Sequence, residues 1–266
     1  MFGKLLKYEF KAVGKWYLGL YAAAISLSVI IGFWLQDFTT RPASSLTGVT
    51  SASTVEGVLL IAILSSFAII LVGLLLSTLF LIVNRFRKNV YGRQGYLTMT
   101  LPVTNHQIIL SKLTAGFIWS LLSSIATIIC LLIIFSITIA PVMNEVTGEM
   151  LQEMSKAFQQ LAETNLIFYY AVGLIADTVN SILLIYFAIS LGQLFKDHRT
   201  LLAIVFYFAI NFAQGIFSFI ILLSMGGDAY TPLNTYSLFT ISLSILLSIG
   251  YYFGTYYIMS NRLNLQ

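Results

Sequence analysis

Charged residues are scarce in this chain of 266 amino acids. Only 9% of its residues are Asp, Glu, Lys or Arg, whereas soluble domains carry about 25%. Hydrophobic residues make up 58% of the chain, and the mean hydropathy is +0.90. A soluble domain has too little interior to bury so much apolar surface. The composition therefore excludes that class and predicts a polytopic helical membrane protein.

Motifs for catalysis and metal binding are also missing. The sequence contains no G-x-x-x-x-G-K-[ST], which excludes ATP binding through a P-loop, and no H-E-x-x-H, which excludes a zinc protease of that type. Its two histidines, His106 and His198, lie in different loops and form no metal site without further ligands. Cys130 is the only cysteine, so no disulfide can form within the chain. We therefore expect neither an enzyme nor a cofactor or metal site on this chain.

Long apolar runs account for most of the sequence. Crossing the hydrocarbon core of a bilayer takes about 20 residues in a helix, and six runs meet that length. They cover approximately 16–34, 58–83, 115–140, 166–194, 201–225 and 237–259. The sequence thus predicts an all-α fold with six transmembrane helices in a single transmembrane domain, 1–266.

Positive charge is concentrated in alternate connections between these runs. With the N-terminus inside, twelve of the fourteen Lys and Arg side chains lie in cytoplasmic segments, and only Arg41 and Lys156 lie in outside loops. Because cytoplasmic loops are enriched in Lys and Arg, we expect both termini in the cytoplasm. The pI of about 9.1 does not indicate nucleic acid. The basic residues lie beside the spans, where the anionic cytoplasmic leaflet accounts for them.

Two segments outside the spans have amphipathic patterns. Residues 1–15 place apolar side chains on one helical face and four lysines mostly elsewhere, which predicts a helix in the membrane interface before the first span. Residues 144–163 combine an apolar face with Glu145, Glu149 and Glu153 on the other. We expect an external helix there, which is either a solvated surface helix or a cover for the outer end of a transport path.

The stretch between the second and third runs, 85–112, is the most basic polar interval. It reads RFRKNVYGRQGYLTMTLPVTNHQIILSK and contains no acid. Its five basic residues are Arg85, Arg87, Lys88, Arg93 and Lys112. A basic connection between two spans should lie on the cytoplasmic side of the membrane.

Residues within this stretch predict its local structure. Gly92 and Gly95 indicate a break in the helix. A short apolar helix that begins near Gly95 would end before Pro102, because the residue preceding a proline avoids the α region. Thr104 or Asn105 would then cap the next helix. The stretch therefore predicts a short apolar helix between two breaks, which is suited to docking another molecule.

Two stretches resemble one protein family. GYLTMTLPVTNHQIILSKL resembles the cytoplasmic segment between spans two and three of permeases in the type-2 superfamily of ATP-binding-cassette (ABC) exporters. LLKYEFKAVGKWY resembles the start of many such permeases from Gram-positive bacteria. The resemblance implies that the first stretch is a coupling helix in a cleft of a separate ATPase subunit. The residues that would contact the ATPase are Gly95, Tyr96, Leu97, Thr98, Met99, Leu101 and Pro102.

The same resemblance implies the partners. A P-loop ATPase subunit would bind ATP and magnesium, and a second permease, identical or a sister chain, would complete the transport path. The segment 1–15 would be an elbow helix that also touches the ATPase. Many such permeases export amphipathic or antimicrobial peptides or lipid-linked compounds, from a bacterial cytoplasmic membrane.

One ionisable side chain, Asp177, lies deep inside a predicted span. Charge that faces lipid is expensive, so Asp177 should face the bundle interior or a wet cavity. Asn180 follows three residues on and shares its face, and Asn211 and Gln214 have the same spacing in the next run. Antiparallel packing would place both pairs at similar depth. They either form hydrogen bonds between helices or make a polar patch on the transport path.

The sequence leaves two alternatives to an ABC permease. A secondary carrier or channel without ATP coupling predicts inverted halves and several buried charges, but we detect no halves and only one such charge, Asp177. A sensory membrane subunit that does not transport would share the fold and the ATPase partner. We expect a permease that uses ATP hydrolysed by a separate subunit.

Overall fold

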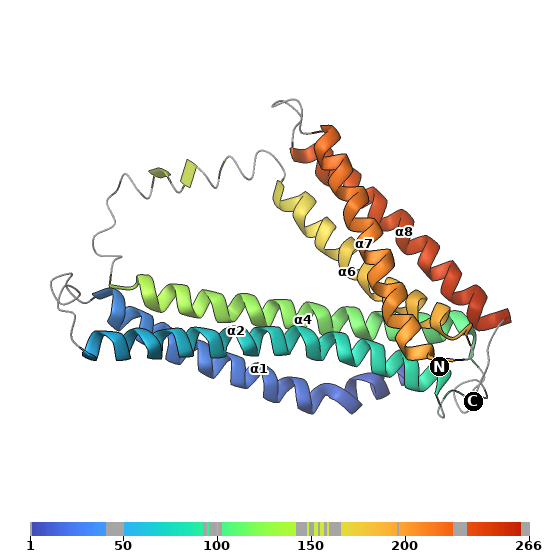
Figure 1. Ribbon diagram of the computed structural model, residues 1–266, viewed down its shortest axis with the longest axis horizontal. Helices are drawn as coiled ribbons and strands as arrows, with labels where there is room; N and C mark the ends of the chain where they lie inside the picture. Colours follow the sequence, from blue (N-terminus) through green and yellow to red (C-terminus); the bar gives the residue numbers. More distant parts are fainter. Residues whose placement is uncertain are drawn as a thin grey trace. The chain divides into compact units, whose positions relative to one another are not determined.

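The chain is built from long helices. The computed structural model describes residues 2–40, 51–92, 103–141, 166–195, 197–225 and 233–261, with a few single residues between them. None of the described residues is in a strand. The elements are α1 (Phe2–Thr40), α2 (Ser51–Phe86), η2 (Arg87–Tyr91), α4 (Asn105–Ile139), α6 (Leu166–Gly192), α7 (Arg199–Met225) and α8 (Leu233–Asn261). Figure 1 labels the α-helices.

Among the described residues, six helices are long and apolar enough to cross a membrane. The candidate spans are Gly14–Asp37, Phe67–Tyr91, Asn105–Ile139, Phe168–Gly192, Arg199–Ser224 and Thr235–Asn261. Each overlaps one apolar run of the sequence, so the prediction of an all-α polytopic membrane protein is confirmed. α4 has 35 residues and is therefore about 52 Å long, whereas the hydrocarbon core is about 30 Å thick. Such a helix must tilt or extend beyond the bilayer.

The amphipathic segment at the N-terminus is not a separate element. α1 runs without interruption through this segment and into the first candidate span. The segment contains no proline that would end the helix. Its amphipathic character is retained, because Lys7, Lys11 and Lys15 are exposed whereas Leu6 and Phe10 are partly buried. The predicted helix is present, but the predicted boundary at residue 15 is not.

The segment predicted as an external amphipathic helix, 144–163, lies mostly outside the described residues. The single residues described within it, among them Glu153 and Lys156, are helical and exposed. The external helix therefore stays a prediction.

The chain divides into two compact units. One comprises Met1–Lys7, Phe80–Phe117 and Met154–Gln266, and the other comprises Tyr8–Leu79 and Ile118–Glu153. In the second unit, α1, α2 and α4 meet through an aromatic contact and a group of hydroxyls. The rings of Tyr17 and Trp119 lie 4.7 Å apart, and Ser123 Oγ lies 2.9 Å from Tyr21 Oη and 3.1 Å from Thr78 Oγ1.

Helix α6 is the centre of the first unit. Its residues from Ile182 to Tyr186 are all buried, so this part of the helix is covered on every side. α8 and α7 pack along it (Figure 1), and the end of α2, η2 and the start of α4 complete the hydrophobic core around it. Gly254 allows α8 to approach α6 closely, because it has no side chain. A Cβ at this position would lie only 2.9 Å from Cδ2 of Phe187 on α6. The central position of α6 determines how the basic segment 85–112 is held.

Candidate functional site

The basic segment 85–112 begins with a change in helix type. α2 passes at Phe86 into η2, a π-helical turn from Arg87 to Tyr91. Gly92 then adopts an extended conformation, and its N–H donates to the carbonyl of Arg87 at 2.9 Å. The break predicted at Gly92 is therefore confirmed. π-Helical turns are rare in proteins and are found frequently at functional sites.

Aromatic packing holds this first end of the segment on α6. The Phe86 ring is fully buried and stacks on the Tyr186 ring, with centroids 4.0 Å apart and planes 12° apart. The Tyr91 hydroxyl donates to Ser190 Oγ at 2.8 Å, and Ser190 Oγ donates in turn to the carbonyl of Tyr186 at 2.8 Å. A buried tyrosine needs a partner for its hydroxyl, so Ser190 specifies where η2 lies along α6.

The other end of the segment is the start of α4. Thr104 Oγ1 accepts a hydrogen bond from the N–H of Gln107 at 3.4 Å, and the carbonyl of Thr104 accepts the first helical bond, from Ile108 N–H at 3.2 Å. Of the two caps predicted, the structure therefore selects Thr104. Ile108 and Ile109 are buried in the core around α6. The last eight residues of the segment, from Asn105 to Lys112, thus belong to a helix that continues into the third candidate span.

His106 ties this second end to α8. Its Nδ1 lies 2.7 Å from the hydroxyl of Tyr252, and its ring stacks on Tyr256 with centroids 4.0 Å apart and planes 13° apart. His106 is therefore part of a helix contact. Among the described residues, no group of three His, Cys, Asp or Glu is arranged to hold a metal ion.

The structure describes both ends of segment 85–112. Of the residues predicted to contact the ATPase, it describes only Gly95. Gly95 is buried, and its N–H donates to the carbonyl of Gly92 at 2.7 Å. Arg87 and Lys88, near the start of segment 85–112, are exposed, so the segment carries positive charge at its surface. The other predicted contact residues lie outside the described residues; they are Tyr96, Leu97, Thr98, Met99, Leu101 and Pro102.

Asp177 and Asn180 meet the same residue of α8. Ser244 Oγ donates to Asp177 Oδ1 at 2.6 Å, and Asn180 Nδ2 donates to the carbonyl of Ser244 at 2.9 Å. Asn180 is buried in this contact, whereas Asp177 is exposed. A carboxyl exposed on the surface of a spanning helix would meet lipid unless a wet cavity or another molecule covers it.

Gln214 of the second polar pair meets another residue of α8. Gln214 Nε2 donates to the hydroxyl of Tyr251 at 2.7 Å, and Asn211 is exposed. Tyr251 and Ser244 are seven residues apart on α8, which separates them by about 10 Å along the helix. The contacts of Asp177 and Gln214 with α8 are therefore about two turns apart, and the similar depth of the two pairs stays a prediction. Sequence reasoning did not identify Ser244 as a partner, since nothing local distinguishes it from the other serines of α8.

A double-mutant cycle measures the contact between Asp177 and Ser244. We expect Asp177→Asn and Ser244→Ala to show a coupling energy of about 0.6–2 kcal/mol in unfolding experiments in mixed micelles, which is the usual range for polar contacts between membrane helices. Ser242→Ala is the matched control, because Ser242 is exposed and its hydroxyl donates only to carbonyls of its own helix. Equal coupling of Asp177 to Ser242 and Ser244 would contradict the observed contact.

Known proteins offer no further guide to the site. No family model matches the chain, and comparisons with curated proteins and with solved structures found no match either.

Proposed function

We propose that this chain is the membrane-spanning permease subunit of an ABC exporter in a bacterial cytoplasmic membrane. The observation that carries the proposal is the way segment 85–112 is held. One end is fixed to α6 through Tyr91 and Ser190, and the other is fixed to α8 through His106 and Tyr252. Rigid elements joined by packed side chains carry movement from one site to another. A partner that moves this segment would therefore move the candidate spans in α6 and α8 with it.

The partner of the segment is a P-loop ATPase subunit, which binds ATP and magnesium in place of this chain. ATP binding closes two ATPase subunits on each other. Each ATPase subunit then moves segment 85–112 of one permease. Two permeases, identical or a pair of sister chains, line the path and alternate between inward and outward access. Both termini lie in the cytoplasm, as the distribution of Lys and Arg favours. The exported substrate is an amphipathic or antimicrobial peptide or a lipid-like compound.

The polar residues between α6, α7 and α8 belong to the transport path in this proposal. Asp177 and Asn211 are exposed on the isolated chain, so a second permease or the path itself must cover them. Asn180 and Gln214 hold the helices that present them, through Ser244 and Tyr251.

Co-purification tests the proposal. We would express the chain with its genomic neighbours, extract the membrane in mild detergent and ask whether a P-loop ATPase accompanies it. The variant Leu97→Asp/Leu101→Asp places two charges on the short apolar helix that the sequence predicts as the docking element. We expect it to lose the ATPase and to keep its far-ultraviolet circular dichroism and elution volume.

The matched control is Leu194→Asp/Leu201→Asp, which makes the same change at two exposed leucines on either side of the other predicted cytoplasmic connection, Leu194 just after α6 and Leu201 in the first turn of α7. This control should retain the ATPase. Failure of the unaltered chain to bind any ATPase would overturn the proposal, and loss of the ATPase from both variants would show that 85–112 is not the docking segment.

A further inference from the structure

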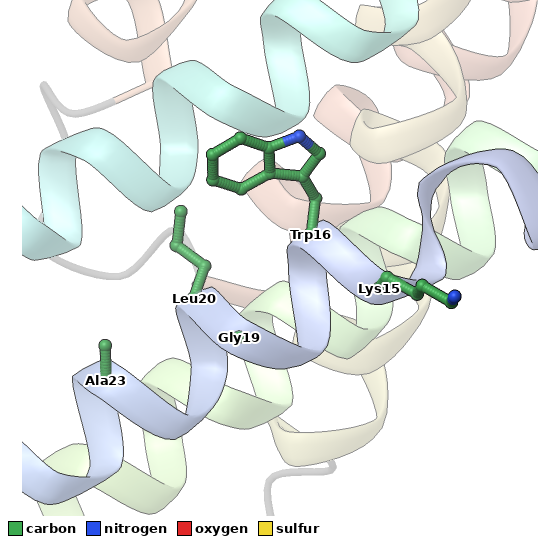
Figure 2. Close-up of a pocket in the computed structure, with 5 residues that line it drawn as sticks. All are labelled: Lys15, Trp16, Gly19, Leu20 and Ala23. Carbon is green, nitrogen blue, oxygen red and sulfur yellow. The ribbon is translucent and has the colours of Figure 1, made fainter.

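Helix α1 carries a hollow on its exposed face, at the start of the first candidate span. Five residues of this one helix line it, and its volume is about 490 Å³. Figure 2 shows Trp16, Leu20 and Ala23 projecting from the same side of the helix, with Gly19 leaving space between them. Lys15 stands at the N-terminal end of the hollow, and its amine points away from the apolar side chains. The hollow is therefore apolar along its length and positively charged at one end.

The depth of these residues matches the layers of a membrane. The candidate span begins at Gly14, so we expect Lys15 at the boundary between the headgroups and the hydrocarbon. Gly19 and Ala23 lie about 6 and 12 Å further along the helix, at acyl-chain depth. Trp16 is 80% exposed and lies where tryptophans are enriched, at the interface. Lys11, one turn before Lys15, is exposed as well and adds a second positive charge above the hollow.

We propose that this hollow binds one anionic phospholipid. The phosphate is held by the amine of Lys15, and one acyl chain lies over Gly19 and Ala23 beside Trp16 and Leu20. The acyl chain gains little by leaving other acyl chains, because lipid tails are as apolar as the hollow. Selection therefore comes from the charge of Lys15, which favours a headgroup with net negative charge over a zwitterionic one, and from the space at Gly19.

A helix from a second copy of the chain is the competing occupant. Gly19 and Ala23 have the small-x-x-x-small spacing of close helix pairs. Two copies share one orientation in the membrane, however, so Lys15 of each would meet its equivalent at the same depth. Like charges that approach in this way repel, whereas a phosphate neutralises Lys15. The charge at the end of the hollow thus favours lipid.

Bromine quenching of Trp16 tests the site. The full chain is reconstituted in phosphatidylcholine vesicles that contain a minor fraction of phosphatidylglycerol. In one preparation the phosphatidylglycerol carries brominated acyl chains, and in its pair an equal fraction of the phosphatidylcholine does. The chain has three tryptophans, so the Trp16 signal is the difference between the unaltered chain and Trp16→Phe. We expect brominated phosphatidylglycerol to quench Trp16 more strongly than the same fraction of brominated phosphatidylcholine.

Two variants separate charge from shape. Lys15→Gln should lower the enrichment of phosphatidylglycerol about fivefold, the factor expected for one lysine near an anionic surface. Lys156→Gln is the control, because it removes an exposed lysine of another segment. It should leave the enrichment unchanged. Gly19→Leu should also lower the enrichment, because it fills the hollow. It should leave the fold intact, since nothing lies within 4 Å of a Cβ placed at Gly19.

Two results would overturn the proposal. Equal quenching of Trp16 by the two brominated lipids would mean that the hollow does not select anionic headgroups. A lower oligomer mass of Gly19→Leu in light scattering, with unchanged quenching, would assign the hollow to a second copy of the chain. Because neither readout depends on an ATPase, the lipid site and the permease function fail or succeed separately.

Discussion

Phe86→Ala is expected to destabilise the chain by about 3–5 kcal/mol, the usual range for emptying a buried aromatic site. The Phe86 side chain is fully buried, and it stacks on Tyr186 at 4.0 Å and meets Tyr91 edge-on at 6.0 Å. The cavity would open where η2 rests on α6, so the first end of segment 85–112 would loosen. Thermal unfolding in detergent, followed by circular dichroism, measures the loss.

Phe80→Ala is the matched control for this prediction. The substitution is the same and lies on the same helix, but the Phe80 side chain is 66% exposed. Substitutions at exposed positions usually change stability by less than about 0.5 kcal/mol. Similar losses for Phe80→Ala and Phe86→Ala would contradict the packing of Phe86 against α6.

Gly192→Val is expected to destabilise the chain by about 1–3 kcal/mol through overpacking. A Cβ at Gly192 would lie 2.6 Å from the carbonyl oxygen of Arg199 and 2.9 Å from the backbone nitrogen of Ala203. Backbone atoms of α7 cannot rotate away as a side chain can, so the connection between α6 and α7 must open. The same unfolding assay measures the effect.

Gly215→Val supplies the comparison for Gly192. Gly215 also lies inside a long helix, but nothing lies within 4 Å of a Cβ placed there. Valine is a better helix former than glycine, so this variant should be as stable as the unaltered chain or slightly more stable. A loss at Gly215 equal to that at Gly192 would show that the contact with α7 is not the cause.

Local signals in the sequence predicted local structure correctly. The six apolar runs, the break at Gly92 and the cap at Thr104 all follow from the chemistry of a few neighbouring residues. The continuity of α1 was missed for a related reason. The amphipathic pattern of residues 1–15 indicates where a helix lies, but it contains nothing that determines where that helix ends.

Contacts between helices could not be predicted, because apolar spans look alike. The most apolar stretches of α6 and α7 have the same mean hydropathy, 1.9. In α6, however, 44% of this stretch is buried, whereas none of it is buried in α7. Which helix becomes central depends on how all of them pack. For the same reason the partners of His106 and Asp177 were missed, since Tyr252 and Ser244 lie 146 and 67 residues away along the chain.

Photo-crosslinking at residue 97 tests the permease proposal most directly. Cys130 is the only cysteine, so Cys130→Ala gives a background in which Leu97→Cys carries the only thiol. This thiol is labelled with a maleimide photo-crosslinker in membranes that contain the neighbouring gene products, and Leu194→Cys is labelled as the control. We predict that light joins position 97, and not position 194, to a P-loop ATPase identified by mass spectrometry. Illumination that joins no ATPase to position 97 would contradict the proposed docking of segment 85–112.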